Sequence, residues 1–312
     1  MNQSNPPPIQ NRSSEPGKTP RQTGALLPAI LILIGCFGLS LYHLLQFSIR
    51  SSLYSHIVLV PMISVYLIWS KRHATPTFSK PARKFAGLLL IAGTLTLAVY
   101  WAAKLTGRTL AQEDSLALTT LSFLFLLTGL CTAFIGRKEI LTHAFPLCFL
   151  VFMVPLPAFV LTSVETFLQH GSAVVAHALF KTVGTPVFNE GLTFKLPGIS
   201  LEIAPECSGI RSSLALFITS LLAGYFFLRT PWKYTVLAFA VIPLAFLRNG
   251  FRVFTIGELC VHLGPDMIDS YIHRQGGPIF FALSLIPFFG LLRLLQKSEH
   301  GGKAGTSKFP AP

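Results

Sequence analysis

Long apolar runs separated by short polar segments fill the chain from residue 25 to residue 296. A helix needs about 20 mostly apolar residues to cross the hydrocarbon core of a bilayer, and eight runs come close to this requirement. The candidate spans are 25–47, 53–69, 85–103, 116–135, 140–158, 207–228, 232–252 and 277–296. The pattern predicts an all-α fold, a polytopic membrane helix bundle with about eight transmembrane helices.

Two segments between the fifth and sixth spans have other patterns. Residues 162–183 have helical periodicity with polar residues interspersed, which is typical of an amphipathic helix lying at the membrane interface. Residues 185–204 contain Gly191, Pro197 and Gly198 among residues that favour β-structure. This second segment predicts a short strand or hairpin, on the extracytoplasmic side, leading into the sixth span.

The two ends of the chain are polar. Residues 1–24 are rich in Pro, Ser, Asn and Gln, which is typical of a disordered tail, and residues 297–312 read as a flexible tail. The first apolar run is too long for the core of a secretory signal peptide, so no cleavable signal is expected. The predicted organisation is therefore a tail over 1–24, a transmembrane domain over 25–296 and a tail over 297–312.

Composition agrees with a membrane protein. The chain is 51% hydrophobic and 12% charged, whereas a soluble domain has about 25% charged residues. The net charge of +13 does not indicate nucleic-acid binding, because the basic residues are spread over separate loops.

The basic residues instead indicate an orientation. With the N-terminus in the cytoplasm, 16 of the 25 basic residues but only three of the 12 acidic residues fall on the inner side. This excess is what the positive-inside rule predicts. Both tails are therefore expected in the cytoplasm, with the start of the sixth span, the end of the seventh and the loop 253–276 on the outer side.

Three polar clusters fall on the predicted outer face, namely PECSGIR at 205–211, RNGFR at 248–252 and YIHRQGG at 271–277. Cys207 is expected at the N-terminus of the sixth span, on one helical face with Arg211 four residues later. A helix N-terminus and a neighbouring guanidinium both favour the thiolate, which is the form that attacks a carbonyl.

The other two clusters supply partners for such a thiolate. His273 is suited to take the thiol proton and return it to a leaving amine. Arg252 is suited to stabilise an oxyanion or to hold a substrate carboxylate. Together the three groups describe acyl transfer or proteolysis through a thioester.

Structural roles remain open for each of these residues. Cys207 is a packing residue in one interpretation, and Cys260, with His262 nearby, is then the competing nucleophile or a disulfide partner of Cys207. Arg248 and Arg252 either line a watery cavity or extend to lipid headgroups. His273 either serves in catalysis, caps a helix or binds a lipid phosphate. Cys36, Cys131 and Cys148 are expected to be small packing residues.

Other classes of site lack their signatures. No HxxxH, CxxC or HExxH pattern is present, so no metal is expected. The phosphate-binding loop GxxxxGK[ST] and the nicotinamide fingerprint are also absent, so no cofactor is expected.

The ordered motifs resemble the exosortase/archaeosortase family of membrane transpeptidases. Its members carry a cysteine in CSGxR, an arginine in NxxR and a histidine or arginine in HxxxG, which fall here on Cys207, Arg252 and His273. The segments MVPLP at 153–157 and TPVFNEG at 185–191 also resemble the family. Arg274 departs from the family pattern, which often has an acidic residue after the histidine.

The resemblance implies a membrane cysteine transpeptidase or protease in the bacterial cytoplasmic membrane, embedded in lipid and active on its outer face. Its partners are then exported proteins with a C-terminal sorting signal, made of a Pro-Glu-Pro-like motif, a membrane helix and a basic tail. An acceptor of unknown identity resolves the thioester. Arg211, Arg248 and Asn249 are the candidates for substrate binding. A transporter or a membrane scaffold in extracellular polysaccharide assembly is the alternative.

Overall fold

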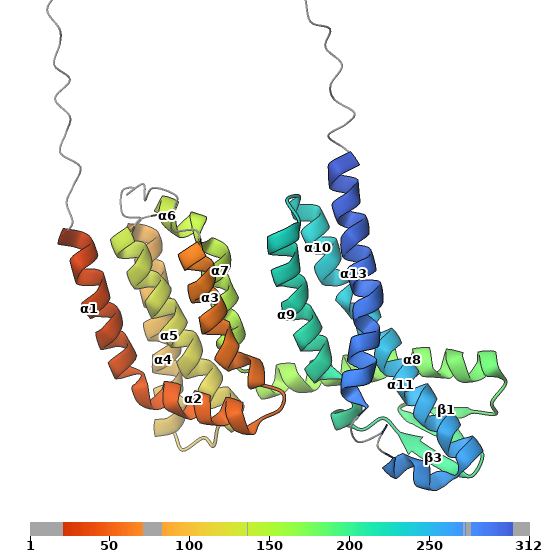
Figure 1. Cartoon of the computed structure of the whole chain (residues 1–312). Coiled ribbons are helices and arrows are strands. Elements are labelled where there is room, and N and C mark those ends of the chain that lie inside the picture. Colours follow the sequence, from red (N-terminus) through yellow and green to blue (C-terminus); the bar gives the residue numbers. More distant parts are fainter. Residues whose placement is uncertain (1–20, 71–82, 136, 271, 273–275, 302–312) are drawn as a thin grey trace, which may run out of the picture. The chain divides into compact units, whose positions relative to one another are not determined.

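The structure is a computed structural model that describes residues 21–70, 83–135, 137–270, 272 and 276–301 (Figure 1). Its contacts divide the chain into two compact units. Unit 1 comprises Met1–Gln46 and Ile57–Val154, and unit 2 comprises Phe47–His56 and Pro155–Pro312. The predicted tails lie mostly outside the described residues, and the helices at both ends extend a few residues into them.

Unit 1 is helical throughout its described part (Figure 1). Its elements are α1 (Arg21–Cys36), α2 (Gly38–Arg50, whose last residues belong to unit 2), α3 (Leu59–Ser70), α4 (Arg83–Leu105), α5 (Gln112–Ile135), α6 (Arg137–Thr142), α7 (Ala144–Phe149) and the 3₁₀ helix η2 (Leu150–Met153). The short 3₁₀ helix η1 (Ser55–Val58) precedes α3.

Small residues bring α4 and α5 together in unit 1. A Cβ on Gly93 would lie 2.8 Å from Leu126 Cγ, and one on Gly129 would lie 2.9 Å from Leu90 Cδ2. Ser122 Oγ donates a hydrogen bond of 2.8 Å to the Gly93 carbonyl across the crossing. This is the packing expected of helices in lipid, where close backbone approach replaces the hydrophobic effect.

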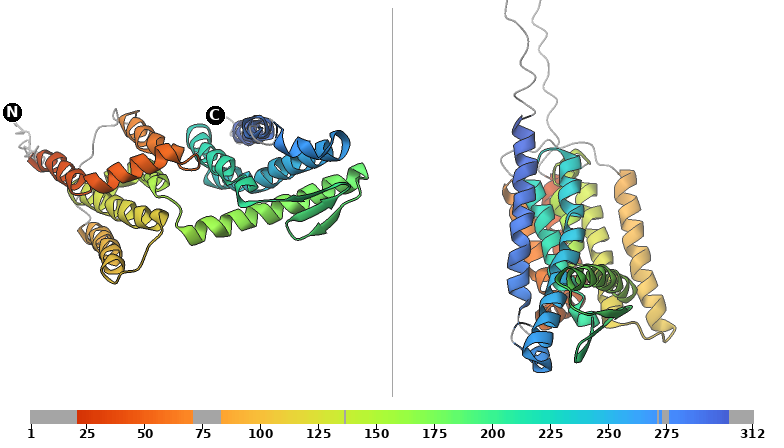
Figure 2. Two further views of the ribbon diagram at one scale, coloured as in Figure 1. Left: turned by 90° about the horizontal axis from the view of Figure 1, so that it is seen from below. Right: turned by 90° about the vertical axis from the view of Figure 1, so that its right-hand side faces the viewer.

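Unit 2 combines membrane helices with a small sheet. Its elements are α8 (Ala158–Val183), β1 (Phe188–Glu190), β2 (Thr193–Leu196), β3 (Ile199–Glu202), the 3₁₀ turn η3 (Pro205–Cys207), α9 (Ile210–Phe227), α10 (Pro231–Phe239), α11 (Val241–Leu263), the 3₁₀ turn η4 (Pro265–Asp269) and α13 (Gly277–Gly301). Within this unit α8 runs across the directions of α9 and α13 (Figures 1 and 2). This is the direction expected of the predicted interfacial helix.

The strands form an antiparallel sheet in the order β1-β2-β3. Each connection has two residues, and each contains a glycine with positive φ, at +66° for Gly191 and +83° for Gly198. Pro197 followed by such a glycine is the residue pair favoured in a type II turn. The prediction of a strand or hairpin in residues 185–204 is therefore confirmed.

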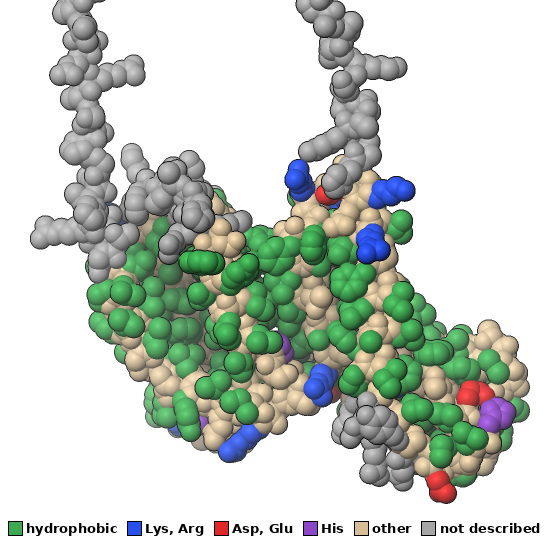
Figure 3. All heavy atoms as spheres, in the orientation of Figure 1, with side chains coloured by type: hydrophobic (Ala, Val, Ile, Leu, Met, Phe, Trp, Pro, Cys, Tyr) green, Lys and Arg blue, Asp and Glu red, His purple; other side chains and the backbone are tan. Residues whose placement is uncertain are grey.

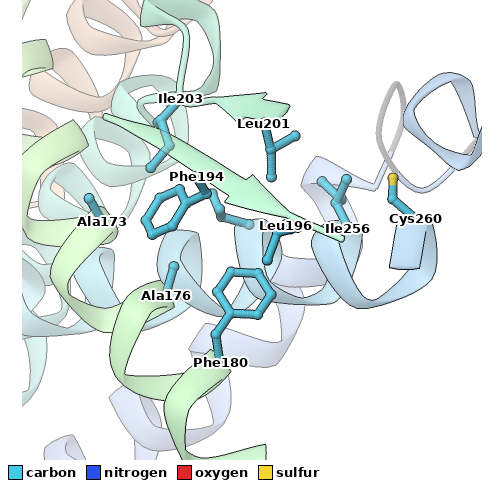
Figure 4. Close-up of a cluster of buried hydrophobic side chains, with 10 residues drawn as sticks. Ala173, Ala176, Phe180, Phe194, Leu196, Leu201, Ile203, Ile256 and Cys260 are labelled. Atoms are coloured by element: carbon cyan, nitrogen blue, oxygen red, sulfur yellow. The ribbon is translucent and has the colours of Figure 1, made fainter. Parts of the chain in front are cut away.

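The sheet packs against α8 and α11 through one buried apolar cluster (Figure 4). Its members are Ala173, Ala176 and Phe180 of α8, Phe194 and Leu196 of β2, Leu201 and Ile203 in and after β3, and Val253, Ile256 and Cys260 of α11. The three α11 members are three and four residues apart, so they form an apolar stripe on one face of the helix that continues beyond Arg252.

This cluster overturns one expectation about the seventh span. The apolar pattern predicts that this span ends at residue 252 and that 253–276 is a loop, but α11 continues to Leu263. The helix continues because the sheet supplies an apolar surface against which Val253, Ile256 and Cys260 are buried. Arg248 and Arg252 consequently lie inside a helix and not at its end.

Long apolar helices are the main elements of the described structure. In the described residues, five helices are long and apolar enough to cross a membrane, or up to seven if two pairs with short breaks are each one span. The segment Ser55–Ser70, predicted as a span, forms a shorter apolar helix. The polytopic helical fold with a short β segment before the sixth predicted span is confirmed, with fewer full-length spans than the eight expected.

Charged side chains gather at opposite ends of unit 2 (Figure 3). The basic side chains Arg229, Lys233, Arg293 and Lys297 belong to the end where α9 stops, α10 starts and α13 approaches its C-terminus. The acidic side chains Glu190, Glu202, Glu258 and Asp266 belong to the sheet, the far end of α11 and η4. The basic side chains Lys181, Lys195 and Arg211 belong to the same end of the unit, so the separation is one of net charge.

Candidate functional site

Cys207 lies in a tight turn between the sheet and the first long helix after it. The Cys207 N–H donates to the Ala204 carbonyl at 2.8 Å, and the Ser208 N–H donates to the Pro205 carbonyl at 3.0 Å. Gly209 then adopts the left-handed conformation, with φ +76°, and α9 begins at Ile210. The cysteine is partly buried and belongs to the turn that precedes the helix.

This geometry corrects the expected relation between Cys207 and Arg211. The two residues were expected on one face of a helix, but only Arg211 is helical, because Gly209 separates the turn from α9. Arg211 is exposed in the first turn of α9. A shared helical face therefore does not bring its guanidinium to the thiol.

Three buried side chains hold the backbone of this turn in place. Gln169 Nε2 donates to the Ile203 carbonyl at 2.7 Å, Asn249 Nδ2 to the Cys207 carbonyl at 2.8 Å, and Arg248 Nη2 to the Gly209 carbonyl at 2.9 Å. The donors come from two different helices, Gln169 from α8 and the other two from α11. Hydrogen bonds that charged or amide groups donate to buried carbonyls contribute more to stability than most hydrogen bonds in a protein.

The same side chains are anchored to neighbouring helices. Asn249 is 2% exposed and also donates to Ser172 Oγ at 3.0 Å, while Arg248 is 7% exposed and also donates to Ser213 Oγ at 3.0 Å. Gly250 permits this arrangement, because a Cβ there would lie 2.9 Å from the Ser172 carbonyl oxygen. The dipeptide Asn249-Gly250 thus allows α11 to approach α8 closely and to reach the cysteine turn.

Cys207 and Arg252 line one pocket. It lies between the end of β3 and α11 and is small, with a volume of about 20 Å³. Its lining residues are Leu201, Glu202, Ile203, Cys207, Asn249, Arg252, Val253 and Ile256. A thiol, a guanidinium and a carboxylate therefore border one small, otherwise mainly apolar space, which suits a nucleophile acting beside a cationic oxyanion ligand.

A second and larger cavity, of about 190 Å³, lies between α11 and α13. Apart from Arg248 and Ser284 its lining is apolar, formed by Leu244, Leu247, Phe251, Phe280, Leu283 and Pro287. Arg248 Nη1 is buried and has no hydrogen-bond partner among the described residues. A buried donor without a partner costs about 1–3 kcal/mol, so this nitrogen is a candidate contact for an anionic group.

His273 lies outside the described residues, as do Arg274 and Gln275. Gly277, the last residue of the HxxxG motif, is the first residue of α13.

Another histidine lies in the described part of residues 253–276. His262 Nε2 lies 3.1 Å from Glu258 Oε2, one helical turn earlier in α11. Glu258 in turn accepts a hydrogen bond from the Thr185 hydroxyl.

Cys260, the competing thiol, is buried in the apolar cluster between α11 and the sheet, with 3% of its surface exposed (Figure 4). Both Cys207 and Cys260 are free, so the disulfide considered between them does not occur in this structure. Its surroundings fit the packing role better than nucleophilic attack. In the part of the chain that the structure describes, no group of three His, Cys, Asp or Glu side chains is placed to hold a metal ion.

Four residues that shape the site have no role in the predictions made from the sequence. Gln169 and Ser172 were part of the polar pattern of an interfacial helix, and Gly209 and Ser213 were unremarked within and after the cysteine motif. Gln169 and Ser172 are three residues apart and so lie on one helical face, which was a usable signal for a buried contact. Their partners were not predictable, because those partners come from distant segments.

Fold and site together define a multi-pass α-helical membrane protein with a cysteine and an arginine in one pocket next to its membrane helices. No curated protein and no solved structure matches the chain significantly. A family model described as transmembrane exosortase (Exosortase_EpsH) matches residues 48–290, which is more than half of the chain. The chain therefore belongs to the transmembrane exosortase family.

Proposed function

We propose that the protein is an integral-membrane cysteine transpeptidase or protease that cleaves the C-terminal sorting signals of exported proteins. The observation that carries this proposal is the pocket shared by Cys207 and Arg252. Membership of the exosortase family supports it independently. In this proposal Cys207 is the nucleophile, Arg252 the oxyanion or substrate-carboxylate ligand, and His273 the general acid and base.

The reaction proceeds through a thioester. His273 accepts the Cys207 proton while the sulfur attacks the carbonyl carbon of the scissile peptide bond, and Arg252 stabilises the resulting oxyanion. The carbon–nitrogen bond then breaks, and His273 returns its proton to the leaving amine. An amine or water finally attacks the thioester carbonyl and releases the Cys207 thiol, which completes transfer or hydrolysis.

Substrate binding involves the second cavity. Arg248 Nη1 is buried at an otherwise mainly apolar groove between α11 and α13. This combination suits a segment with an acidic group next to an apolar stretch, as in a sorting motif that precedes a membrane helix. Arg211, exposed at the start of α9, is a further contact for the acidic motif.

Asn249 has a different role from the substrate contact first expected. Its two amide hydrogens bond to Ser172 and to the Cys207 carbonyl. We infer that Asn249 is a positioning residue, which acts on the reaction by fixing the backbone that carries the thiol.

The proposed location is the bacterial cytoplasmic membrane, with both termini in the cytoplasm and the cysteine pocket facing the exterior. The net charge at the two ends of unit 2 supports this orientation, because basic side chains outnumber acidic ones at the end of the helices away from the sheet but not at the sheet end (Figure 3). The positive-inside rule assigns that basic end to the cytoplasm.

Processing of a tagged substrate tests the function. Cys207→Ala is expected to reach the membrane at the wild-type level but to leave the substrate uncut on an immunoblot. Cys260→Ala is the matched control and is expected to process normally, because its thiol is buried in the apolar cluster. Normal processing by Cys207→Ala would remove the mechanism, and loss of processing in stably expressed Cys260→Ala alone would transfer the role to that residue.

A further inference from the structure

One edge of the three-stranded sheet is open beside the candidate site. The order β1-β2-β3 makes β3 a terminal strand, and no other strand pairs with it among the described residues. The side chains of Ser200 and Glu202 on this strand are exposed. β3 contains no proline, which would remove an N–H group from this edge.

The register identifies the backbone groups on the open side. The Ile203 N–H donates to the Leu192 carbonyl at 3.0 Å, which continues the pairing of β3 with β2. Hydrogen-bonded residues alternate along an antiparallel strand, so Leu201 also bonds to β2. Ser200 and Glu202 therefore direct their N–H groups, and Ser200 its carbonyl, away from the sheet.

This open edge leads directly to the candidate nucleophile. The chain runs from β3 through Ala204 into the turn that carries Cys207. Leu201, Glu202 and Ile203 line the same pocket as the thiol. The Glu202 carbonyl accepts a hydrogen bond from the Ala204 N–H at 3.1 Å, so the open part of the edge ends where the pocket begins.

We propose that the substrate segment next to the scissile bond binds in an extended conformation as a fourth strand along β3. Main-chain pairing with Ser200 and Glu202 supplies affinity that does not depend on the side chains of the substrate. The pairing also brings the substrate backbone to Cys207 in a fixed register. The inference rests on the proposed function, since it identifies the conformation of the substrate for that reaction.

Proline substitution removes the outward N–H without breaking the sheet. In Ser200→Pro the lost N–H is one that does not bond to β2, and an edge strand tolerates proline at such a position. Processing of the tagged substrate is expected to fall about tenfold, which corresponds to the loss of one good hydrogen bond. Ser200→Ala keeps the N–H and is expected to process like wild type.

Asn189→Pro is the control on the opposite edge of the sheet. Asn189 pairs with Phe194 but, by the same alternation, turns its N–H away from β2. This variant is expected to retain processing, which separates loss of the β3 edge from a general effect of proline in the sheet. Equal loss in Asn189→Pro and Ser200→Pro would overturn the inference, as would wild-type processing by Ser200→Pro.

A substrate-side experiment is independent of folding of the variants. Synthetic peptides spanning the cleavage site carry one N-methyl group each, moved residue by residue, and are assayed with the wild-type protein. Pairing with one strand edge predicts that kcat/KM falls at every second residue. A uniform effect, or none, would overturn the inference while leaving the proposed function intact, because that function fails only if Cys207→Ala still cleaves the unmodified peptide.

The edge also has another conceivable occupant, the β3 edge of a second copy of this chain. That arrangement predicts that Ser200→Pro changes the oligomeric state in detergent and leaves peptide cleavage unaltered. Size-exclusion chromatography with light scattering measures this, and such a result would replace the substrate strand with a homodimer contact.

Discussion

Gly209 satisfies two requirements at once in the cysteine turn. Its φ of +76° lies in the left-handed region, and a Cβ there would approach Arg248 Nη2 to 2.8 Å and Asn249 Oδ1 to 3.0 Å. A side chain at this position therefore strains the backbone and displaces the two residues that hold it. The glycine of the CSG sequence is thus part of the support of the thiol.

A pair of glycine substitutions separates these two effects. Gly209→Ala is expected to lose about 1–2 kcal/mol of stability from its backbone conformation and, in addition, to lose most processing activity because Arg248 and Asn249 move. Gly198→Ala has the same kind of φ but meets no atom within 4 Å, so it should lose stability alone. Thermal unfolding in detergent and the processing assay measure the two quantities, and equal activity in both variants would contradict the positioning role.

At the residue scale, sequence patterns were sufficient for some of the site and not for the rest. Cys207 and Arg252 were selected from motif order, and they line one pocket. The support by Gln169 and Ser172 was missed, because a buried polar network depends on which helices cross. The expected pairing of Cys207 with Arg211 was wrong because Gly209 interrupts the helix before it reaches the cysteine.

At the scale of elements, contact between α11 and the sheet determines where the pocket forms. Gly257 of α11 lies against Phe180 of α8 and Leu196 of β2, and a Cβ there would be 2.5 Å from the Phe180 ring and 3.0 Å from Leu196 Cδ1. The close approach allows α11 to pack against α8 and against the sheet whose strand β3 leads to the pocket. We expect a larger residue at this position to shift the sheet relative to Arg252.

Gly257→Ala tests this packing. The substitution is expected to cost about 1–3 kcal/mol, as overpacking of a filled core does, and to reduce processing because β3 shifts. Gly290→Ala in α13 is the control, since a Cβ there meets nothing within 4 Å, and it should stabilise the helix by about 0.5–1 kcal/mol. A Gly257→Ala protein with unchanged melting temperature would show that the contact is not tight.

Most elements were predictable from apolar periodicity, and the exceptions have a physical cause. The hairpin segment was recognisable from its glycines, its proline and the residues around them. The end of α11 was predicted too early because the part of the helix after Arg252 is apolar on one side only, and that side faces the sheet. The apolar stripe of α11 is visible in the sequence, but the sequence does not show which surface packs against it.

At the scale of the whole molecule, the distribution of charge along unit 2 indicates how the protein is oriented in the membrane. An excess of basic over acidic side chains lies at the end of the helices that is distant from the sheet and from Cys207 (Figure 3). The cysteine pocket is therefore expected outside the cytoplasmic membrane, where exported substrates are available. This orientation follows from basic residues, which were countable from the sequence alone.

Labelling with a membrane-impermeant thiol reagent tests the orientation. In a variant that retains Cys207 as its single cysteine, labelling is expected in intact cells once the reagent can pass the outer membrane. A single-cysteine Lys297→Cys variant should react only after the membrane is permeabilised. The reverse pattern would invert the topology, and absence of Cys207 labelling at any pH would favour a transporter or scaffold in which the cysteine is structural.

The central claim is that Cys207 forms a covalent thioester with the substrate. Trypsin separates the two candidate thiols, because residues 196–211 contain Cys207 alone and residues 253–274 contain Cys260 alone. Mass spectrometry of the acid-quenched reaction, without added acceptor, is expected to find substrate mass on peptide 196–211 that hydroxylamine removes. Substrate cleavage with that peptide unmodified and the adduct on peptide 253–274 would contradict the account.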